Sequence, residues 1–464
     1  MPTEDGKSAN TGMDGLTSPW LEDFGASLLR PELGAYSPAS NLSQNDVIRA
    51  RQRAGEPIVN LGFGQSPFPI PQPAVDSLRQ HAADGRYLPA CGIPELRQAV
   101  SEFHRRLDQL DPDIFTPDGV VCGPGSKELI FLIMTVFRGT VYIGAPSWTT
   151  YRPQTLLSGR SCVTLGLSAA DSWKITPEII GANLTGDPCR LLVLANPDNP
   201  TGQVYSDSEL AALAEFLRRE RFIVVSDEIY ARLNFSLSHR SLARLYPEGC
   251  IVTSGLSKWA GAGGWRLGYA LFPRPLESFR RAVASAATHT YSCCAAPVQH
   301  AALTLLGNPE ETAKHSNRSA RILAALARHC ERRLTEAGAV VAPAGGGFYL
   351  LPDFEVAREG LRQLLGSASK EPTGAAMCER ILSDIGVALM PAGPAFLRPE
   401  SELTVRLCFV EFDGAAALQA VRELELEEAD NSAPLPDDFA AKYCEPTYSA
   451  VVRLADWLRS VQQA

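Results

Sequence analysis

Lys258 stands in a setting that suits covalent chemistry. It lies in the string GLSKWAGAGGWRLG, directly after an apolar run at residues 250–253 that we expect to be a buried strand. A lysine among glycine, alanine and tryptophan can be desolvated, which lowers its pKa and makes its amine nucleophilic. Arg266, further along the same string, has a planar guanidinium that can clamp a phosphate. Most lysines are surface charges, so this pattern needs support from other residues.

Asp227 ends another apolar run, residues 222–226, and Tyr230 follows it closely. A carboxylate at the end of a buried strand needs a cationic partner, and a protonated pyridine nitrogen is one such partner. A helix N-cap is the alternative role for this aspartate. Tyr230 shares the neighbourhood and could hydrogen-bond a phenolate oxygen. In open α/β sheets ligands bind beyond the carboxyl ends of the strands, where both side chains are expected.

Two loops supply further polar groups. The string NPDNPTG at residues 196–202 follows an apolar run, and its two Asn-Pro pairs fix a rigid turn that can hold the Asn199 amide. A plain turn is the alternative. The string GPGSKE at residues 123–128 lies between a strand-like run and an apolar helical stretch. The backbone N–H groups of Gly125, Ser126 and Lys127 would open that helix, and a helix N-terminus binds anions.

These residues lie among alternating strand-like and helix-like segments. Short apolar runs at residues 119–122, 141–143, 161–165, 191–195, 222–226 and 250–253 suit parallel strands that are buried on both faces. Helical patterns lie between them, for example at residues 126–137 and 207–219. Strand–helix alternation predicts an α/β fold with a mainly parallel sheet.

The pattern changes after about residue 305. A helical pattern at residues 309–337 precedes strand-like segments at 347–351, 387–390 and 404–409, which indicates a smaller α+β domain. We expect a disordered tail at 1–18, a large α/β domain at 72–305, a small domain from 19–71 and 306–429, and a helical extension at 430–464. The extension ends in an amphipathic pattern at residues 448–461, for which a docked structural helix is the simplest interpretation.

The composition restricts the class of protein. The 464 residues carry 43 Lys and Arg against 52 Asp and Glu, so the net charge of −9 indicates no basic surface for nucleic acid or an anionic membrane. The 11 cysteines form no Cys-x-x-Cys pair, which argues against a disulfide framework or a metal site and favours a reducing, cytoplasmic location. Ordinary packing of the neighbouring Cys293 and Cys294 is favoured over a redox role. No apolar run approaches the roughly 18 residues of a membrane span.

Taken together, the strings resemble one family. NPDNPTG, SDEIY and GLSKWAGAGGWRLG occur in the order typical of class I/II aminotransferases of the fold-type I pyridoxal-phosphate family, and the chain resembles its aspartate, aromatic and kynurenine aminotransferase group. The strings YLPACGIPELR and GQSPF support the resemblance, which covers roughly residues 41–425. It implies a large domain with a mainly parallel seven-stranded sheet between helices, and a smaller α+β domain. It also implies a homodimer that moves an amino group from an L-amino acid to a 2-oxo acid by a ping-pong mechanism.

The resemblance implies roles for individual residues. Lys258 would hold pyridoxal 5'-phosphate as a Schiff base and move protons, and Asp227 would pair with the pyridinium nitrogen so that the ring acts as an electron sink. Tyr230 and Asn199 would hydrogen-bond the phenolic oxygen, and Trp148 would stack on the ring. The remaining implied contacts are Gly125, Ser126, Lys127, Ser257 and Arg266 to the phosphate, Tyr87 to the phosphate of the neighbouring subunit, and Arg406 with Asn199 and the Gly64 backbone to the substrate α-carboxylate.

One position departs from the family pattern. Many relatives carry a phosphate-binding serine three residues before the lysine, and this chain has Gly255 there. Ser254 or Ser257 can take over that contact, and the sequence does not decide between them.

The substrate and one alternative reaction stay open. Lys127 could bind the distal carboxylate of an acidic amino acid or be a solvated first-turn lysine, whereas Phe348, Tyr349 and Trp148 could accept an aromatic side chain. A β-lyase or a cyclopropane-forming synthase would use the same lysine and aspartate. A cofactor-binding regulator is a remote alternative, because such proteins carry a basic DNA-binding module and the N-terminal segment here is short and acidic.

Overall fold

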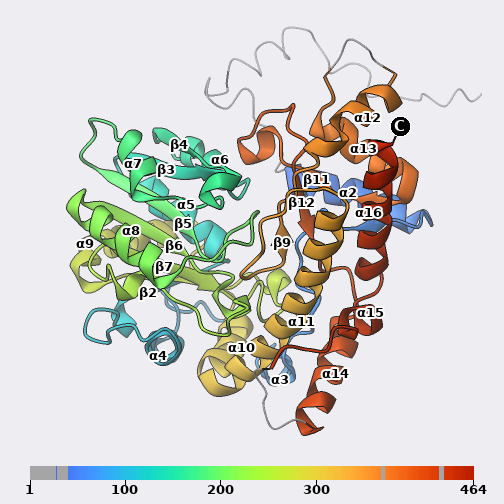
Figure 1. Cartoon of the computed structure of the whole chain (residues 1–464). Helices are drawn as coiled ribbons and strands as arrows, with labels where there is room; N and C mark the ends of the chain where they lie inside the picture. The colour runs from blue at the N-terminus through green and yellow to red at the C-terminus, as the bar shows by residue number, and fades with distance from the viewer. Residues whose placement is uncertain (1–27, 29–39, 367–370, 428–432, 464) are drawn as a thin grey trace, which may run out of the picture. The chain divides into compact units, whose positions relative to one another are not determined.

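The computed structural model describes Leu28 and residues 40–366, 371–427 and 433–463. Residues Ala39–Ala464 form one compact unit, and Figure 1 shows its elements. The tail expected at residues 1–18 lies outside the described part of the chain. Among the described helices, none combines the length and the hydropathy that crossing a membrane requires.

The centre is a seven-stranded sheet in the order β2-β8-β7-β6-β5-β3-β4. Only β8 runs opposite to its neighbours: it pairs antiparallel with β2 and β7, and the other pairs are parallel. This confirms the α/β fold with a mainly parallel sheet, although the short strand β8 did not stand out in the sequence. The strands are β2 (Val120–Gly123), β3 (Thr140–Ala145), β4 (Cys162–Gly166), β5 (Arg190–Ala195), β6 (Phe222–Asp227), β7 (Cys250–Gly255) and β8 (Gly268–Leu271).

Helices cover both faces of this sheet, because successive residues of a strand point to opposite faces. In β6, Val224 packs in one apolar cluster with Leu213 of α8, and Val225 packs in another with Leu132 of α5. The first cluster takes side chains from α3 (Gln72–Gln80), α4 (Pro94–Leu107), α7 (Pro177–Ala182), α8 (Asp207–Arg219) and α10 (Ala296–Leu306). The second takes them from α5 (Ser126–Val136), α6 (Tyr151–Leu157) and α9 (Glu277–His289).

Two smaller sheets form from the remaining segments. One is three-stranded and antiparallel, in the order β11-β12-β9, and the other pairs β1 with β10 in parallel. Their strands are β1 (Val59–Asn60), β9 (Tyr349–Leu350), β10 (Val387–Ala388), β11 (Met390–Pro391) and β12 (Val405–Cys408). The accompanying helices are α2 (Ser40–Arg53), α11 (Pro309–Glu336), α12 (Arg358–Leu364), α13 (Gly374–Ile385) and α14 (Gly414–Glu427). The division into a large and a small domain stays a prediction.

Beyond these elements lie α15 (Phe439–Tyr443) and α16 (Thr447–Gln462). Helix α16 lies beside α11 and contacts α12 and α13. Its apolar face buries Leu454, Leu458 and Val461. At its C-terminal half, Trp457 Nε1 donates a hydrogen bond to Asp384 Oδ2 at 2.9 Å.

The register of the large sheet aligns the carboxyl ends of three strands. Ala195 of β5 pairs with Asp227 of β6, and Asp227 pairs in turn with Thr253 of β7. The loops that leave these strands therefore start side by side at one edge of the sheet, and they carry Asn199, Tyr230 and Lys258.

Candidate active site

Lys258 lies in the loop after β7, with its side chain half-buried. Its Nζ donates a hydrogen bond to the carbonyl oxygen of Gly64 at 3.1 Å and lies 5.5 Å and 5.4 Å from the ring centres of Tyr230 and Phe348. Burial lowers the pKa of Lys258 to about 8, and the positive charge of Arg406 acts in the same direction. More of this amine is therefore uncharged and nucleophilic near neutral pH than in an ordinary lysine.

Asp227 is the last residue of β6 and is 3% exposed. Tyr151 donates its hydroxyl hydrogen to Asp227 Oδ2 at 2.8 Å, whereas Oδ1 has no hydrogen-bond partner among the described residues. Burial raises the pKa of Asp227 to about 6, and the hydrogen bond from Tyr151 opposes that rise. A buried oxygen without a partner is costly, and the N–H of a protonated pyridine ring would satisfy it.

Tyr230 and Tyr349 face each other across the same region. Their hydroxyl oxygens lie 2.9 Å apart, and burial raises the pKa of both groups well above the usual range. Tyr349 also approaches the backbone of Gly64 closely, because a Cβ at that position would lie 2.1 Å from the Tyr349 hydroxyl oxygen. Glycine is therefore required at residue 64, where the carbonyl contacts Lys258.

The residues expected to bind a phosphate form a cradle at the start of α5. Gly125 precedes the helix with a φ of 92°, a conformation that favours glycine. A Cβ at Gly125 would lie 2.3 Å from Arg266 Nη2, and a Cβ at Gly268 would lie 2.3 Å from the backbone nitrogen of Ser126. The guanidinium of Arg266 thus lies against Gly125, and its Nη2 donates to the carbonyl of Pro124 at 3.0 Å. A guanidinium beside a helix N-terminus suits an anion.

The region around Gly255 explains the departure from the family pattern. A Cβ at Gly255 would lie 2.8 Å from the carbonyl oxygen of Leu267, so the pairing of β7 with β8 leaves no room for a serine side chain. Ser254 is buried and donates to the carbonyl of Glu228 at 3.2 Å, away from the cradle. Ser257 Oγ instead accepts a long hydrogen bond from Arg266 Nη1 at 3.5 Å. Of the two serines, only Ser257 contacts the cradle.

Lys127 and Trp148 meet beside this cradle. Lys127 Nζ lies 5.0 Å from the centre of the Trp148 ring, within the range of a cation–π contact. Burial lowers the pKa of Lys127, and the neighbouring charge of Arg266 contributes to the effect. Lys127 is therefore held against the indole ring, in contrast to a freely solvated first-turn lysine.

Arg406 on β12 is almost fully buried, at 1% exposure. Its Nη2 donates to the carbonyl of Gly62 at 2.7 Å and its Nη1 to Asn199 Oδ1 at 3.5 Å. Its guanidinium carbon lies 5.0 Å from the Tyr349 ring centre and 5.3 Å from that of Phe396. Within the described residues, Nε has no hydrogen-bond partner. A buried guanidinium with spare donors suits a carboxylate ligand.

The structure brings most of the expected site residues together and leaves one apart. Lys258 lies near Gly64 and Tyr230, Arg406 contacts Asn199, and the cradle groups Arg266 with Gly125, Ser126 and Ser257. Tyr87 points away, with 91% of its surface exposed. The role expected for Tyr87 is toward a neighbouring subunit, so its exposure leaves that prediction open.

Sequence reasoning missed the role of Tyr151. Its hydroxyl donates a hydrogen bond to Asp227 Oδ2. The two residues are 76 positions apart in the sequence, so no local pattern links them. The string PSWTTY offered a signal, because Tyr151 closely follows Trp148, and in the structure the Tyr151 N–H donates to the Trp148 carbonyl at 3.1 Å in the turn that leads into α6.

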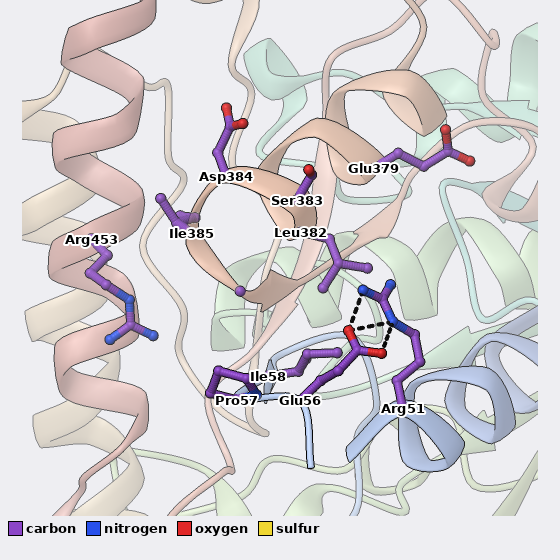
Figure 2. A pocket seen from close by; sticks show the side chains of 11 residues that line it. Arg51, Glu56, Pro57, Ile58, Glu379, Leu382, Ser383, Asp384, Ile385 and Arg453 are labelled. Carbon is purple, nitrogen blue, oxygen red and sulfur yellow. Dashed lines mark hydrogen bonds and ion pairs between the residues drawn. The ribbon is translucent and has the colours of Figure 1, made fainter. Parts of the chain in front are cut away.

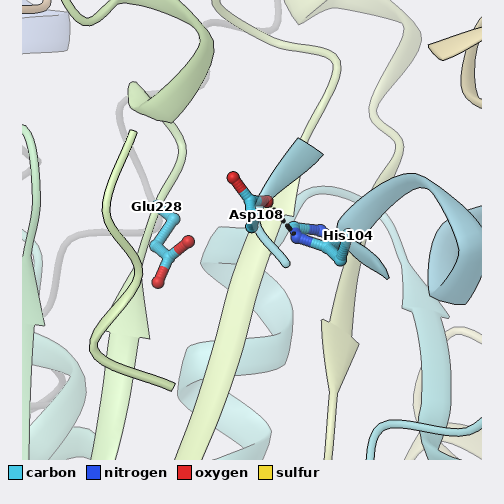
Figure 3. Close-up of side chains that lie close together, drawn as sticks. All are labelled: His104, Asp108 and Glu228. Carbon is cyan, nitrogen blue, oxygen red and sulfur yellow. Dashed lines mark hydrogen bonds and ion pairs between the residues drawn. The ribbon is translucent and has the colours of Figure 1, made fainter. Parts of the chain in front are cut away.

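A second polar cluster includes Glu228, the residue after Asp227, and Figure 3 shows its three members. The possible metal-ligating atoms of His104, Asp108 and Glu228 all lie within 4.8 Å of one another. His104 Nδ1 contacts Asp108 Oδ2 at 2.7 Å, Asp108 also pairs with Arg232, and Glu228 Oε2 contacts His239 at 2.9 Å. Each group thus has protein partners, and we interpret the cluster as a buried ion-pair network.

An open cavity of about 650 Å³ lies between α2, α13 and α16 (Figure 2). Arg51 and Glu56 on its wall form an ion pair at 2.6 Å, and Arg453 lies on the opposite side on α16. None of its lining residues belongs to the expected site. This cavity is therefore separate from the candidate active site at the edge of the large sheet.

The comparisons with known proteins agree with this geometry. Residues 56–420 match the family described as Aminotransferase class I and II. An aspartate aminotransferase of Bacillus sp. (strain YM-2) is 28% identical over 72% of this chain and 85% of its own, and the aspartate/prephenate aminotransferase of Thermus thermophilus is 30% identical over 69% and 82%. The solved structure of the Thermus thermophilus aspartate aminotransferase with maleate has a TM-score of 0.73 at 27% identity, covering 85% of this chain and 99% of its own. The chain belongs to the class I and II aminotransferases, and it is a transaminase that acts on amino acids and keto acids.

Proposed function

We propose that this aminotransferase works with pyridoxal 5'-phosphate bound covalently to Lys258, through a ping-pong mechanism with an L-amino acid and a 2-oxo acid. The observation that carries the proposal is the pair formed by Asp227 Oδ1 and Lys258 Nζ. One is a buried acceptor without a hydrogen-bond partner in the described part of the chain, and the other is the amine of a half-buried side chain whose pKa is lowered to about 8. When bound, the cofactor supplies an electron sink for charge that develops at the substrate α-carbon.

The residues around this pair fit the parts of such a cofactor. Asp227 would hold the ring nitrogen in its protonated form, and Tyr230 with Asn199 would bind the phenolic oxygen. Trp148 would cover the ring face. The phosphate would lie in the cradle formed by Gly125, Ser126, Lys127, Ser257 and Arg266, where Gly125 already approaches Arg266 closely.

Lys258 would act as the proton carrier once the amine of the substrate has replaced it on the cofactor and its own amine is free. An amine with a pKa of about 8 can take a proton at Nζ from the substrate α-carbon and return it to the cofactor. General acid–base catalysis of this kind contributes roughly 10²–10⁴-fold in rate. The Gly64 carbonyl, at 3.1 Å from Nζ, would orient the amine between transfers.

Arg406 would bind the α-carboxylate of the substrate, since Nε has no described partner and the guanidinium is held by Gly62 and Asn199. We further propose that an acidic amino acid is the preferred donor and that Lys127 binds its distal carboxylate. The relatives named aspartate aminotransferase support this choice, as does the half-buried position of Lys127 against Trp148. An aromatic donor packing against Phe348 and Tyr349 is the second candidate.

The active enzyme is proposed to be a homodimer that shares its sites. A tyrosine that is 91% exposed is unusual for a monomer and suits a residue that reaches the phosphate of the partner's site. A cytoplasmic location also belongs to the proposal, and the 11 free cysteines support a reducing compartment.

Borohydride reduction followed by peptide mapping tests the central claim. Reduction of cofactor-saturated protein should fix a pyridoxyl group on the peptide that carries Lys258, and the variant Lys258→Ala should be colourless and inactive. Lys174→Ala serves as the matched control, because it removes another half-buried lysine, which pairs with Glu209 at 2.9 Å, and should keep the label on Lys258. A label on a different lysine, or no label on saturated protein, would overturn the proposal. Assaying a panel of amino donors with 2-oxoglutarate then identifies the donor.

A further inference from the structure

We propose that Arg398 is a positioning residue for substrate binding: it ties the chain beside Arg406 to the carboxyl ends of β3 and β4, and so fixes where Arg406 lies relative to the cofactor site. Arg398 belongs to the β11–β12 connection, which comprises residues 392–404. None of the strings that carry the family resemblance includes it. The inference rests on the proposed function, because it takes Arg406 as the site of the substrate α-carboxylate.

The guanidinium of Arg398 joins two parts of the structure. Its Nη1 donates to the carbonyl of Leu167 at 2.9 Å and to that of Ala145 at 3.3 Å. Its Nε and Nη2 donate to the two carboxylate oxygens of Glu402 at 2.9 Å and 2.6 Å. A carboxylate bound in this way holds the planar fork in one orientation, so Glu402 directs Nη1 toward the two carbonyls. The guanidinium carbon also lies 5.4 Å from the ring centre of Trp173, within the range of a cation–π contact.

The two carbonyls lie at the edge of the large sheet that carries the candidate active site. Ala145 is the last residue of β3 and pairs with Gly166, the last residue of β4. The backbone N–H of Leu167 donates to the Ala145 carbonyl at 2.9 Å. Trp148, which is proposed to cover the cofactor ring, follows Ala145 by three residues. Arg398 therefore contacts the strand end from which the chain leads to Trp148.

The residues just before Arg398 extend this link to Arg406. Phe396 is fully buried, and its ring centre lies 5.3 Å from the guanidinium carbon of Arg406. Leu397 packs against the same apolar cluster as Trp148. Its φ is 64°, a conformation that a bulky side chain rarely adopts and that persists only where surrounding contacts enforce it. Residues 396–398 thus join the carboxylate-binding arginine to the part of the sheet that carries Trp148.

This link predicts what the loss of Arg398 does to the reaction. Without its fork, the connection loses its hydrogen bonds to β3 and β4, and Phe396 and Arg406 can shift relative to the cofactor site. A misplacement of about 1 Å can cost roughly 100-fold in rate. Every amino acid donor carries the α-carboxylate that Arg406 is proposed to bind, so the effect should not depend on the side chain of the donor. Lys127, in contrast, is proposed to act on acidic donors alone.

The variant Arg398→Gln tests the inference, with Arg358→Gln as the matched control. Arg358 on α12 also donates to a glutamate, Glu355, at 2.7 Å and to a carbonyl of the same connection, that of Ser401, at 2.8 Å. The two arginine side chains are exposed to similar extents, 18% for Arg398 and 22% for Arg358. Their losses of thermal stability should therefore be comparable. Of the two, Arg398 alone contacts β3 and β4, so only Arg398→Gln should alter substrate binding.

Three readouts on the holoenzymes distinguish positioning from a merely structural role. The KM for L-aspartate, assayed with 2-oxoglutarate, should rise roughly 10-fold or more in Arg398→Gln, while kcat changes by less than about threefold. The ratio of kcat/KM for L-aspartate to that for L-phenylalanine should stay within about twofold of the wild-type ratio. The dissociation constant for pyridoxal 5'-phosphate should also stay within about twofold, because the proposed cofactor contacts remain.

A KM for L-aspartate within about twofold of the wild-type value in Arg398→Gln, or an equal rise in Arg358→Gln, would overturn the inference and leave the proposed function intact. Failure of the proposed function has a different signature, because Arg406→Lys would then leave the KM unchanged. If Arg398→Gln folds poorly, Glu402→Gln provides the second measurement, since it keeps Arg398 and weakens the carboxylate that orients its fork. A KM raised several-fold in folded Glu402→Gln supports the inference, and an unchanged KM contradicts it.

Discussion

The amine of Lys258 reaches the carbonyl of Gly64, with 3.1 Å between Nζ and the oxygen. A carbonyl oxygen accepts a hydrogen bond from the charged and from the neutral amine, so this contact holds the side chain in both states. Burial meanwhile favours the neutral state. The hydrogen bond to Gly64 thus orients Lys258. Unlike a contact with a carboxylate, it does not favour the charged form of the amine.

The lowered pKa predicts how cofactor attachment depends on pH. The pKa of Lys258 is about 8 in place of the usual 10.5, so half of the amine is neutral at about pH 8 and nearly all of it above about pH 9 to 10. The rate at which apoenzyme binds pyridoxal 5'-phosphate, followed by stopped-flow absorbance, should rise steeply from pH 6, reach half of its maximum near pH 8 and level off above about pH 9. A rate that still increases roughly tenfold between pH 8.5 and pH 9.5 would show an unperturbed lysine.

Replacing Arg406 by lysine should weaken substrate binding selectively. The change keeps the charge but removes the planar fork that can bind a carboxylate with two hydrogen bonds. A loss of roughly 10- to 100-fold in kcat/KM is expected, from the usual strength of charged hydrogen bonds, with little change in cofactor affinity. The control is Arg321→Lys, which alters another buried arginine that pairs with Glu425 at 3.0 Å. Equal effects of both variants on kcat/KM would contradict a substrate role for Arg406.

The two serines near Gly255 should differ in their effect on the cofactor. Ser257 contacts Arg266 in the cradle, whereas Ser254 donates to the carbonyl of Glu228. Ser257→Ala should therefore raise the dissociation constant for pyridoxal 5'-phosphate by several-fold, on the order of one hydrogen bond. Ser254→Ala should lower the thermal stability with a smaller effect on that constant. Titration of the two apoenzymes compares them directly, and the reverse order would assign the contact to Ser254.

Placing the family's common serine at position 255 should destabilise this protein. A Cβ there would lie 2.8 Å from the Leu267 carbonyl oxygen and 2.9 Å from Gly268 Cα, so Gly255→Ser must push β8 away from β7. The expected loss is roughly 1–3 kcal/mol in the free energy of unfolding, as for other overpacked sites, with no gain in cofactor affinity. Gly166→Ser is the control, because nothing lies within 4 Å of a Cβ at that end of β4. Tighter cofactor binding in Gly255→Ser would contradict this prediction and show that β7 and β8 can move apart to accommodate the serine.

The sequence predicted the parts of the fold that depend on local patterns. The apolar runs gave six strands of the large sheet, because parallel strands buried on both faces are continuously apolar. Strand β8 was not predicted, because Gly268–Leu271 is only four residues long and follows a glycine-rich loop. Helix α8 (Asp207–Arg219) matches its expected bounds, helped by a capping box in which Ser206 and Glu209 satisfy each other's backbone N–H groups.

Pairings between distant residues could not be read from such patterns. Asn199 and Arg406 meet although 207 residues separate them, and Tyr151 reaches Asp227 across 76 residues. Periodicity reports which face of an element is apolar, and it says nothing about which side chains meet across loops. The family resemblance supplied Arg406 through its motif. The string PSWTTY places Tyr151 near Trp148, but only the three-dimensional structure shows that its hydroxyl reaches Asp227.

Helix α16 is expected to stabilise the protein without taking part in the chemistry. Leu458 is fully buried on the face that packs against the rest of the unit, so Leu458→Ala removes apolar contacts and leaves a cavity. Such changes typically reduce the free energy of unfolding by roughly 2–5 kcal/mol, which thermal or urea denaturation can measure. Arg453→Ala, on the exposed side of the same helix, should change it by less than about 0.5 kcal/mol. The kcat/KM of folded Leu458→Ala should match that of the wild type, and a marked loss at a temperature where the variant is fully folded would show that α16 also acts on the active site.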